Sequence, residues 1–209
     1  MSLPAPALLV ITDRESASRP LEDVIAAALR GGCRWLSVRE KDLARDELVA
    51  LIGRVVALAR PLCATITLHG DPAAAEAAGA DGVHLSAGGS PAEARARLGP
   101  KALIGLSVHS AVEAANADRA ADYVTLSPIF LSASKPGYGP PLGAPGLAGA
   151  VATSTVPIVA LGGIRSERVA ECLAAGAAGV AVMGAVMAAA DAEAATAALI
   201  RALTHADEG

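Results

Sequence analysis

The stretch CLAAGAAGVAVM (172–183) has the pattern of a helix end, a small-residue stop and a short buried strand. AEAAGADGVHLS (75–86) and ADRAADYVTLS (117–127) repeat this pattern, and ALRGGCRWLSV (28–38) is a weaker copy. Glycine just after a helix adopts the left-handed conformation that ends it. A strand that is apolar nearly throughout is typical of one covered on both faces. The repeated unit is therefore a helix followed by a strand.

The same alternation extends along the whole chain. Short apolar runs predict strands over residues 8–12, 34–39, 64–69, 81–86, 102–107, 122–127, 156–161 and 178–183. Helices are predicted over residues 20–31, 43–60, 72–79, 91–98, 110–119, 144–151, 166–175 and 185–203. Eight alternating units in 209 residues predict a single domain, 1–209, folded as a (β/α)8 barrel. A doubly wound sheet is the alternative, but it usually has a glycine-rich turn after its first strand, and ITDRESASRP (11–20) contains no glycine.

Composition limits the expected partners. Hydrophobic residues make up 53% of the chain and aromatic residues 2%, so we expect a deep core of small side chains. The net charge is −4 and no basic stripe is present, which argues against a nucleic-acid partner. No apolar run has the length of a membrane span, and the N-terminus lacks the charged region of a signal peptide, so we expect a cytoplasmic protein without a membrane partner. The oligomeric state is left open, with a homo-oligomer as one possibility.

The second predicted strand ends in basic residues. In a (β/α)8 barrel, functional side chains lie at the carboxyl ends of the strands and in the loops that follow. Alternation in SVREKD (37–42) places Ser37, Arg39 and Lys41 on one side, so the two cations can converge on an anion above the barrel and Ser37 is a candidate for substrate binding. The alternative is an ordinary solvated loop.

Histidine and serine side chains occur at the next three strands. His69 ends the third strand and is expected at the barrel mouth, as either a catalytic or a structural residue. His84 lies within the fourth strand and is expected to pack in the barrel wall. Ser107, His109 and Ser110 surround the start of a helix, which either serine can cap. Either serine can also bind a ligand, and Ser107 and His109 are candidates for substrate binding.

The sixth strand is followed by the longest loop, SPIFLSASKPGYGPPLG (127–143). A loop of this length in a compact domain is usually functional or disordered. Ser132, Ser134 and Lys135 make it a candidate lid over an anionic ligand. The alternative is a flexible loop whose serines only interact with solvent.

The seventh and eighth strands both run directly into glycine, in ALGGI and AVMGAV. Backbone N–H groups at a helix start attract phosphate, and a residue without a Cβ permits close approach. The loops after strands seven and eight of such barrels often bind phosphate. Gly162, Gly163, Met183 and Gly184 are therefore predicted to form a phosphate cup, with simple tight turns as the alternative.

Taken in order, these motifs resemble the thiamine phosphate synthase/TenI family from about residue 8 to residue 189. The matching segments are ITDR, SVREKD, AGADGVHL, GLSVHS, ADYVTLSPIF, SASKPGYGPPLG, VPIVALGGI and AAGAAGVAVMGAV. The resemblance implies a (β/α)8 barrel. A synthase of this family joins a pyrimidine, carried on pyrophosphate, to a thiazole phosphate.

The resemblance also implies roles for individual residues. A synthase has a pyrophosphate-binding basic pair, a serine on strand five, a Thr-x-Thr-Lys lid and a thiazole-phosphate cup. Arg39 and Lys41 match the basic pair, and Ser107 matches the serine on strand five. Ser132, Ser134 and Lys135 match the lid, with serine for threonine, and Gly163 with the 183–184 backbone matches the cup.

The chain departs from the synthase pattern at several positions. A typical synthase has glutamine in place of Ser37, Asn-Asp in place of His69 and Gly70, and a further aspartate in place of Gly89. Because the two aspartates of a synthase hold magnesium, no metal site built from side chains is expected here. TenI-type members resemble thiazole tautomerases, which move a proton within a thiazole carboxylate phosphate. The histidine that follows strand six in some of them is Pro128 here.

Three functions remain as expectations, each with a small phosphorylated thiazole as the partner. The first is a metal-independent thiazole tautomerase, an isomerase in which His69 transfers the proton and Arg39 and Lys41 hold the substrate carboxylate. The second is a divergent thiamine phosphate synthase, for which magnesium would be the cofactor. The third is a noncatalytic sensor, which would bind thiazole phosphate without turnover.

Overall fold

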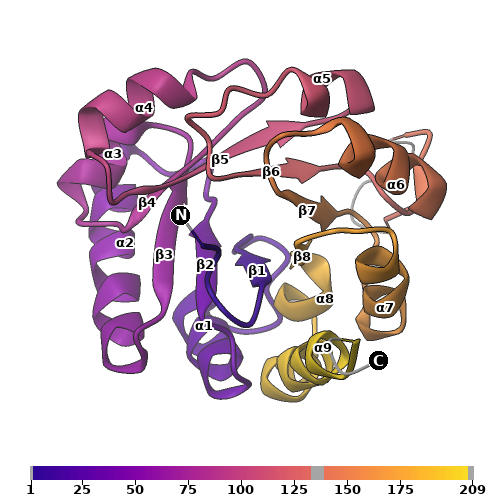
Figure 1. The fold of residues 1–209 in the computed structure, drawn as a ribbon. Helices are drawn as coiled ribbons and strands as arrows, with labels where there is room; N and C mark the ends of the chain where they lie inside the picture. Colours follow the sequence, from indigo (N-terminus) through magenta and orange to yellow (C-terminus); the bar gives the residue numbers. More distant parts are fainter. Residues whose placement is uncertain (1, 133–138, 207–209) are drawn as a thin grey trace.

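The structure, a computed structural model, describes residues 2–132 and 139–206. Eight parallel strands close into a barrel in the order in which they occur in the sequence (Figure 1). They are β1 (Leu8–Ile11), β2 (Trp35–Val38), β3 (Thr65–His69), β4 (Gly82–Leu85), β5 (Leu103–Val108), β6 (Tyr123–Leu126), β7 (Ile158–Leu161) and β8 (Gly179–Val182). The predicted (β/α)8 barrel is confirmed.

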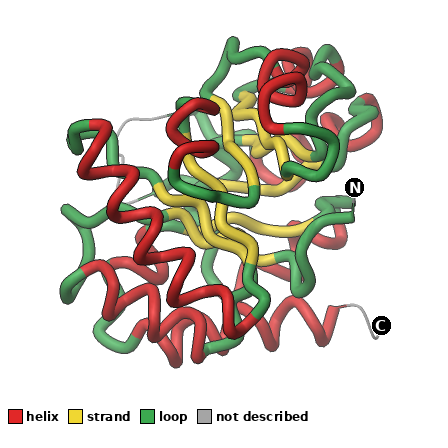
Figure 2. Tube along the Cα trace, turned by 90° about the vertical axis from the view of Figure 1, so that its left-hand side faces the viewer, coloured by secondary structure: helices red, strands yellow, loops and turns green. Residues whose placement is uncertain are grey.

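Helices surround the strands, as the tube in Figure 2 shows. They are α1 (Leu21–Arg30), α2 (Arg45–Ala59), the 3-10 helix η1 (Arg60–Leu62), α3 (Pro72–Ala77), α4 (Pro91–Leu98), α5 (Ala111–Ala115), α6 (Gly143–Thr153), α7 (Ser166–Ala174), α8 (Gly184–Met187) and α9 (Ala192–Ala206). None of the helices in the described ranges combines the length and hydropathy of a membrane span.

One predicted helix is wrong in its extent. The segment predicted as a single helix over 185–203 forms α8 and α9, with a break between them. The break arises because the Asp191 carboxylate accepts a hydrogen bond from the Ala194 N–H over 2.9 Å, which starts a new helix at that point. The short α8 therefore stays at the carboxyl end of β8, where it borders the barrel mouth.

The core has one part between strands and helices and a second part inside the barrel. The inner part is made by residues Leu9, Ile11, Trp35, Leu103, Tyr123, Val159 and Ala181. The rings of Trp35 and Tyr123, the first residues of β2 and β6, meet edge to face with their centroids 4.7 Å apart. These two aromatic side chains pack inside the lower barrel, below the level at which the strands end.

A glycine on β5 makes room for polar side chains above this layer. A Cβ on Gly105 would overlap both the Tyr123 ring and the His84 imidazole. Without it, the His84 and Tyr123 rings pack with their centroids 5.4 Å apart. The small residues of the barrel thus admit an imidazole to its interior.

Candidate active site

A cavity of about 860 Å³ opens at the carboxyl ends of the strands, and residues from all eight strands or the loops that follow them line it. The predicted site residues on its wall are Arg39, Lys41, His69, Ser107, His109, Ser132, Gly162, Gly163, Met183 and Gly184. Ser134 and Lys135, also predicted, lie outside the described residues. Ser37 is fully buried and does not line the cavity, so its position lends no support to the predicted contact with substrate.

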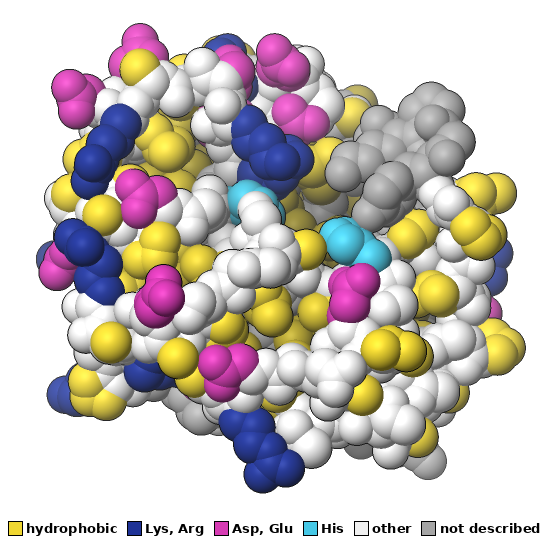
Figure 3. All heavy atoms as spheres, turned by 90° about the horizontal axis from the view of Figure 1, so that it is seen from above, with side chains coloured by type: hydrophobic (Ala, Val, Ile, Leu, Met, Phe, Trp, Pro, Cys, Tyr) yellow, Lys and Arg dark blue, Asp and Glu magenta, His cyan; other side chains and the backbone are white. Residues whose placement is uncertain are grey.

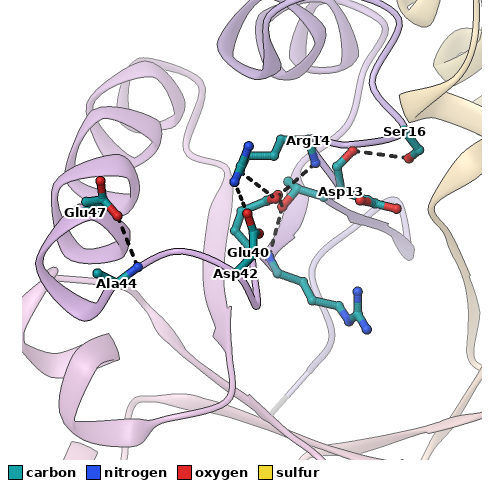
Figure 4. A network of polar contacts seen from close by, with 9 residues as sticks. Asp13, Arg14, Ser16, Glu40, Asp42, Ala44 and Glu47 are labelled. Atoms are coloured by element: carbon teal, nitrogen blue, oxygen red, sulfur yellow. Dashed lines mark hydrogen bonds and ion pairs between the residues drawn. The ribbon is translucent and has the colours of Figure 1, made fainter.

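The basic pair on the β2 side is held by a cluster that we call the β1–β2 clamp, formed by Thr12, Arg14, Glu40 and Asp42. The Thr12 hydroxyl donates to Glu40 Oε1 over 2.5 Å and accepts from the Arg39 N–H over 2.9 Å. The Arg14 N–H donates to Glu40 Oε2 over 3.0 Å, and the Arg14 guanidinium pairs with Asp42 (Figure 4). Because Glu40 is buried, the clamp ties the backbone that carries the basic pair to the end of β1.

His69 lies where the sequence placed it, at the end of β3 and on the cavity wall. It pairs in register with His84 of β4, and the two ring centroids are 5.2 Å apart. Its Nε2 atom lies 3.4 Å from the Ser86 hydroxyl. A ligand in the cavity can therefore reach this imidazole, and its catalytic role stays a prediction.

His84 forms part of the cavity floor and is 2% exposed. Its Nδ1 lies 2.9 Å from the Tyr123 hydroxyl, and its Nε2 lies 3.0 Å from Ser107 Oγ and 3.2 Å from Thr125 Oγ1. Burial, with a smaller effect from the charge of His69, lowers the pKa of His84 from 6.5 to about 3. His84 is therefore neutral near pH 7 and orients Ser107. The expectation that it packs in the barrel wall is only partly right, because it also reaches the cavity.

His109 and the serines near it are divided between cavity and helix. The His109 ring Nδ1 lies 3.0 Å from the Ser127 carbonyl oxygen. The backbone N–H of His109 donates to Glu113 Oε2 over 2.7 Å. The Ser110 hydroxyl accepts from the Glu113 N–H over 3.1 Å and so caps α5. Of the two serines that the sequence offered as caps, Ser110 fills that role and Ser107 faces the cavity.

The glycine pair after β7 has two structural reasons. Gly162 and Gly163 have φ values of +105° and +63°, which glycine adopts without strain. A Cβ on Gly162 would lie 3.0 Å from Pro128 Cα, and one on Gly163 would overlap the backbone of residues 130–131. The Phe130 N–H also donates to the Gly162 carbonyl oxygen over 3.0 Å. The chain after β6 therefore packs against this turn, a reason for glycine that sequence reasoning missed.

Sequence reasoning also missed several cavity residues. Arg165 lines the cavity next to the β7 turn, and Ser16, Ser86 and Ser127 add hydroxyl groups. The signal for Arg165 was present, since a basic residue follows the glycine pair within GGIR. Figure 3 shows histidine side chains on the face seen from above, with lysine or arginine side chains beside them. Arg39, Lys41 and Arg165 line the cavity and none of its described lining residues is acidic, so the charges on its wall favour an anionic ligand.

The chain is similar in sequence and in structure to proteins named for thiamine phosphate synthesis. The family model described as thiamine monophosphate synthase matches residues 8–186. A thiamine-phosphate synthase from Roseiflexus sp. (strain RS-1) is 40% identical over 193 residues, which cover 91% of this chain and 82% of that protein. A putative thiamine-phosphate synthase from Geobacter sulfurreducens is 42% identical over 184 residues, covering 87% and 86%. The solved thiamine phosphate pyrophosphorylase from Pyrococcus furiosus aligns with a TM-score of 0.84 and 31% identity, covering 95% and 96%.

Proposed function

The chain belongs to the thiamine monophosphate synthase family, and on this premise we propose that it is a transferase that joins a pyrimidine carried on pyrophosphate to a thiazole phosphate. Relatives that are 40% and 42% identical are named as synthases of thiamine phosphate, one of them putatively, which supports this function. The sequence had placed this function second. The isomerase that it placed first receives no support from these names.

The observation that carries the proposal is one cavity lined both by cations and by glycine turns. Arg39 and Lys41 enter it from the β2 side, whereas the glycine turns of β7 and β8, together with Arg165, enter it from other strands. Both proposed substrates carry phosphate groups, which guanidinium groups, ammonium groups and backbone N–H groups bind. The rest of the wall includes apolar residues, among them Ile11, Leu161 and Ala181, as the faces of two aromatic rings require.

In the proposed reaction, the thiazole nitrogen forms a bond to the methylene carbon of the pyrimidine. The bond from that carbon to the pyrophosphate oxygen breaks, and its electron pair leaves with pyrophosphate. Negative charge therefore builds up on the leaving group, where Arg39 and Lys41 stabilise it. The β1–β2 clamp helps to place this pair, because it holds the Arg39 N–H and the side chain of Glu40 between them. Ser107, oriented by His84, offers a hydroxyl to the substrates from the floor of the cavity.

The test is turnover with both substrates and magnesium, followed by mass spectrometry. We expect thiamine phosphate and pyrophosphate in equal amounts. Arg39→Gln should lower kcat/KM by about 10²–10³-fold, the usual loss when one donor to a developing anion is removed. Arg54→Gln is the matched control, since Arg54 pairs with Glu22 on the surface, and it should retain full activity. Absence of product from the unaltered protein would contradict the proposal.

One observation keeps the thiazole tautomerase as a second candidate. Its reaction needs a proton-transfer group and no metal, and His69 lies on a cavity wall without acidic residues among the described ones. The same preparation, given the thiazole carboxylate phosphate alone, distinguishes the two. Isomerisation without synthase turnover, lost in His69→Asn, would replace the transferase with the isomerase.

A further inference from the structure

We infer that pyrophosphate binds beside Arg39 and Lys41, on the β2 side of the cavity, without a divalent cation held by the protein. His69 acts there as a further hydrogen-bond donor. The inference rests on the proposed function and concerns how the leaving group is stabilised. The family resemblance implies magnesium, held by carboxylates after strands three and four. The residues of this chain do not fit that ion.

The first reason is the donor set. Magnesium is held in proteins mainly by carboxylate oxygens together with substrate phosphates. None of the described cavity residues is acidic, and the sequence ASKPGY over 133–138 contains no acidic residue either. Within residues 2–132 and 139–206, no group of three His, Cys, Asp or Glu side chains could hold a metal.

The second reason is the backbone at the two positions where a synthase has its aspartates. Gly70 has a φ of +125°, which residues with a Cβ rarely adopt. A Cβ on Gly89 would lie 2.9 Å from the Leu85 Cβ and 3.1 Å from the Ser86 carbonyl oxygen. These loops have therefore taken shapes that suit glycine, and a carboxylate at either position would require the backbone to move.

The third reason is that Glu40 and Asp71, carboxylates on the loops after β2 and β3, already have partners. Asp71 accepts a hydrogen bond from the Ala73 N–H over 2.8 Å and caps α3. Glu40 accepts hydrogen bonds from the Thr12 hydroxyl and the Arg14 N–H within the β1–β2 clamp. Coordination of a metal by either carboxylate would break these hydrogen bonds.

The positive groups on β2 and β3 are arranged to replace the ion. Val38 pairs with Leu68, so the next residues, Arg39 and His69, follow on adjacent strands, and both line the cavity together with Lys41. Arginine, lysine and an imidazole N–H all donate to phosphate oxygens. As the carbon–oxygen bond breaks and its electron pair leaves with pyrophosphate, these donors bind the oxygens on which charge develops, and no proton has to transfer.

Calorimetry with inorganic pyrophosphate tests the binding. In EDTA we expect pyrophosphate to bind, and added magnesium should not tighten binding. Binding seen only with magnesium, or tightened tenfold or more by it, would overturn the inference, as would no binding under either condition. The measurement does not depend on turnover.

Matched variants test the named residues. In EDTA, His69→Leu and Lys41→Gln should each weaken pyrophosphate binding about 10- to 100-fold, the usual effect of losing a hydrogen bond to a charged group. His69→Asn, which keeps an N–H donor, should lose less than His69→Leu. Lys101→Gln makes the same change in charge as Lys41→Gln at an exposed position before β5, and it should bind as tightly as the unaltered protein. Equal affinity of His69→Leu and unaltered protein would remove His69 from the site.

Turnover in EDTA then separates the two proposals. Thiamine phosphate formed in EDTA supports both the inference and the proposed function. Product formed only with magnesium would sustain the proposed function and overturn the inference. If no product forms with or without magnesium, the proposed function fails, and the calorimetry alone decides the inference.

Discussion

Inside the barrel, His84 has two ring nitrogens within hydrogen-bond distance of three hydroxyl groups, on Tyr123, Ser107 and Thr125. At least one ring nitrogen must accept a hydrogen bond in the neutral form, whereas both donate in the charged form. A fully buried imidazole also pays a large desolvation cost when it is protonated. Both effects keep His84 neutral, which makes it a fixed support for Ser107 and a poor candidate for acid–base catalysis.

This environment predicts how stability depends on pH. The pKa of His84 is about 3 in the folded protein and 6.5 without the fold, so below pH 6.5 the unfolded state binds a proton that the folded state does not. The free energy of unfolding should therefore fall, as pH drops from 6.5 toward 3, by up to about 1.4 kcal/mol per pH unit from this residue. Urea unfolding of His84→Gln should show a shallower decline between pH 6.5 and pH 4.5. An identical decline in both proteins would show that His84 does not carry the effect.

At the scale of elements, β1 and β2 are joined above the barrel by side chains as well as by the sheet. The β1–β2 clamp places a buried carboxylate, Glu40, between the Thr12 hydroxyl and the Arg14 N–H. A buried charge of this kind is tolerated only when hydrogen bonds satisfy it. The clamp thereby fixes the direction in which β2 leaves the barrel, and so the placement of Arg39 and Lys41.

Replacing Glu40 with glutamine tests the clamp. The amide keeps one acceptor but turns an NH2 group toward a donor, so we expect a loss of about 1–3 kcal/mol in the free energy of unfolding. Pyrophosphate affinity should fall as well, although Glu40 is not among the residues that line the cavity. Glu15→Gln, an identical change at an exposed residue, should alter stability by less than about 0.5 kcal/mol. Unchanged pyrophosphate affinity in Glu40→Gln would mean that the clamp stabilises the fold without positioning the basic pair.

The turn after β7 allows a second test at this scale. Gly163→Ala forces a side chain into a positive φ and against residues 130–131, so it should lower the free energy of unfolding by at least about 1–3 kcal/mol. Gly53→Ala is the opposite case, because Gly53 lies within α2 and a Cβ there meets nothing within 4 Å. It should raise stability by about 0.5–1 kcal/mol. Chemical denaturation measures both, and equal effects of the two changes would contradict the packing seen at Gly163.

At the scale of the whole molecule, closure of the barrel turns separate strand ends into one site. Residues from all eight strands or their following loops line the same cavity, although the chain between the first and the last of them spans most of the protein. Inner side chains pack in the lower barrel, and the cavity opens at the carboxyl ends of the strands. The result is a cavity with no acidic side chain among its described residues, in a protein whose net charge is −4. The charged residues that line the site, Arg39, Lys41 and Arg165, are therefore opposite in sign to the net charge of the molecule.

By itself, the sequence determined the order of helices and strands, the barrel and the positions of Arg39, His69 and Gly163 at strand ends, because periodicity and glycine stops act over a few neighbouring residues. Only the tertiary structure decided what surrounds them. Thr12 meets Glu40 across 28 positions and His84 meets Tyr123 across 39, so neither pair follows from local pattern. Burial, which sets the pKa of His84, and the close approach of residues 130–131 to the β7 turn exist only once the barrel has closed. Side-chain type and spacing are local properties, whereas desolvation and contact depend on which distant segments the closed sheet brings together.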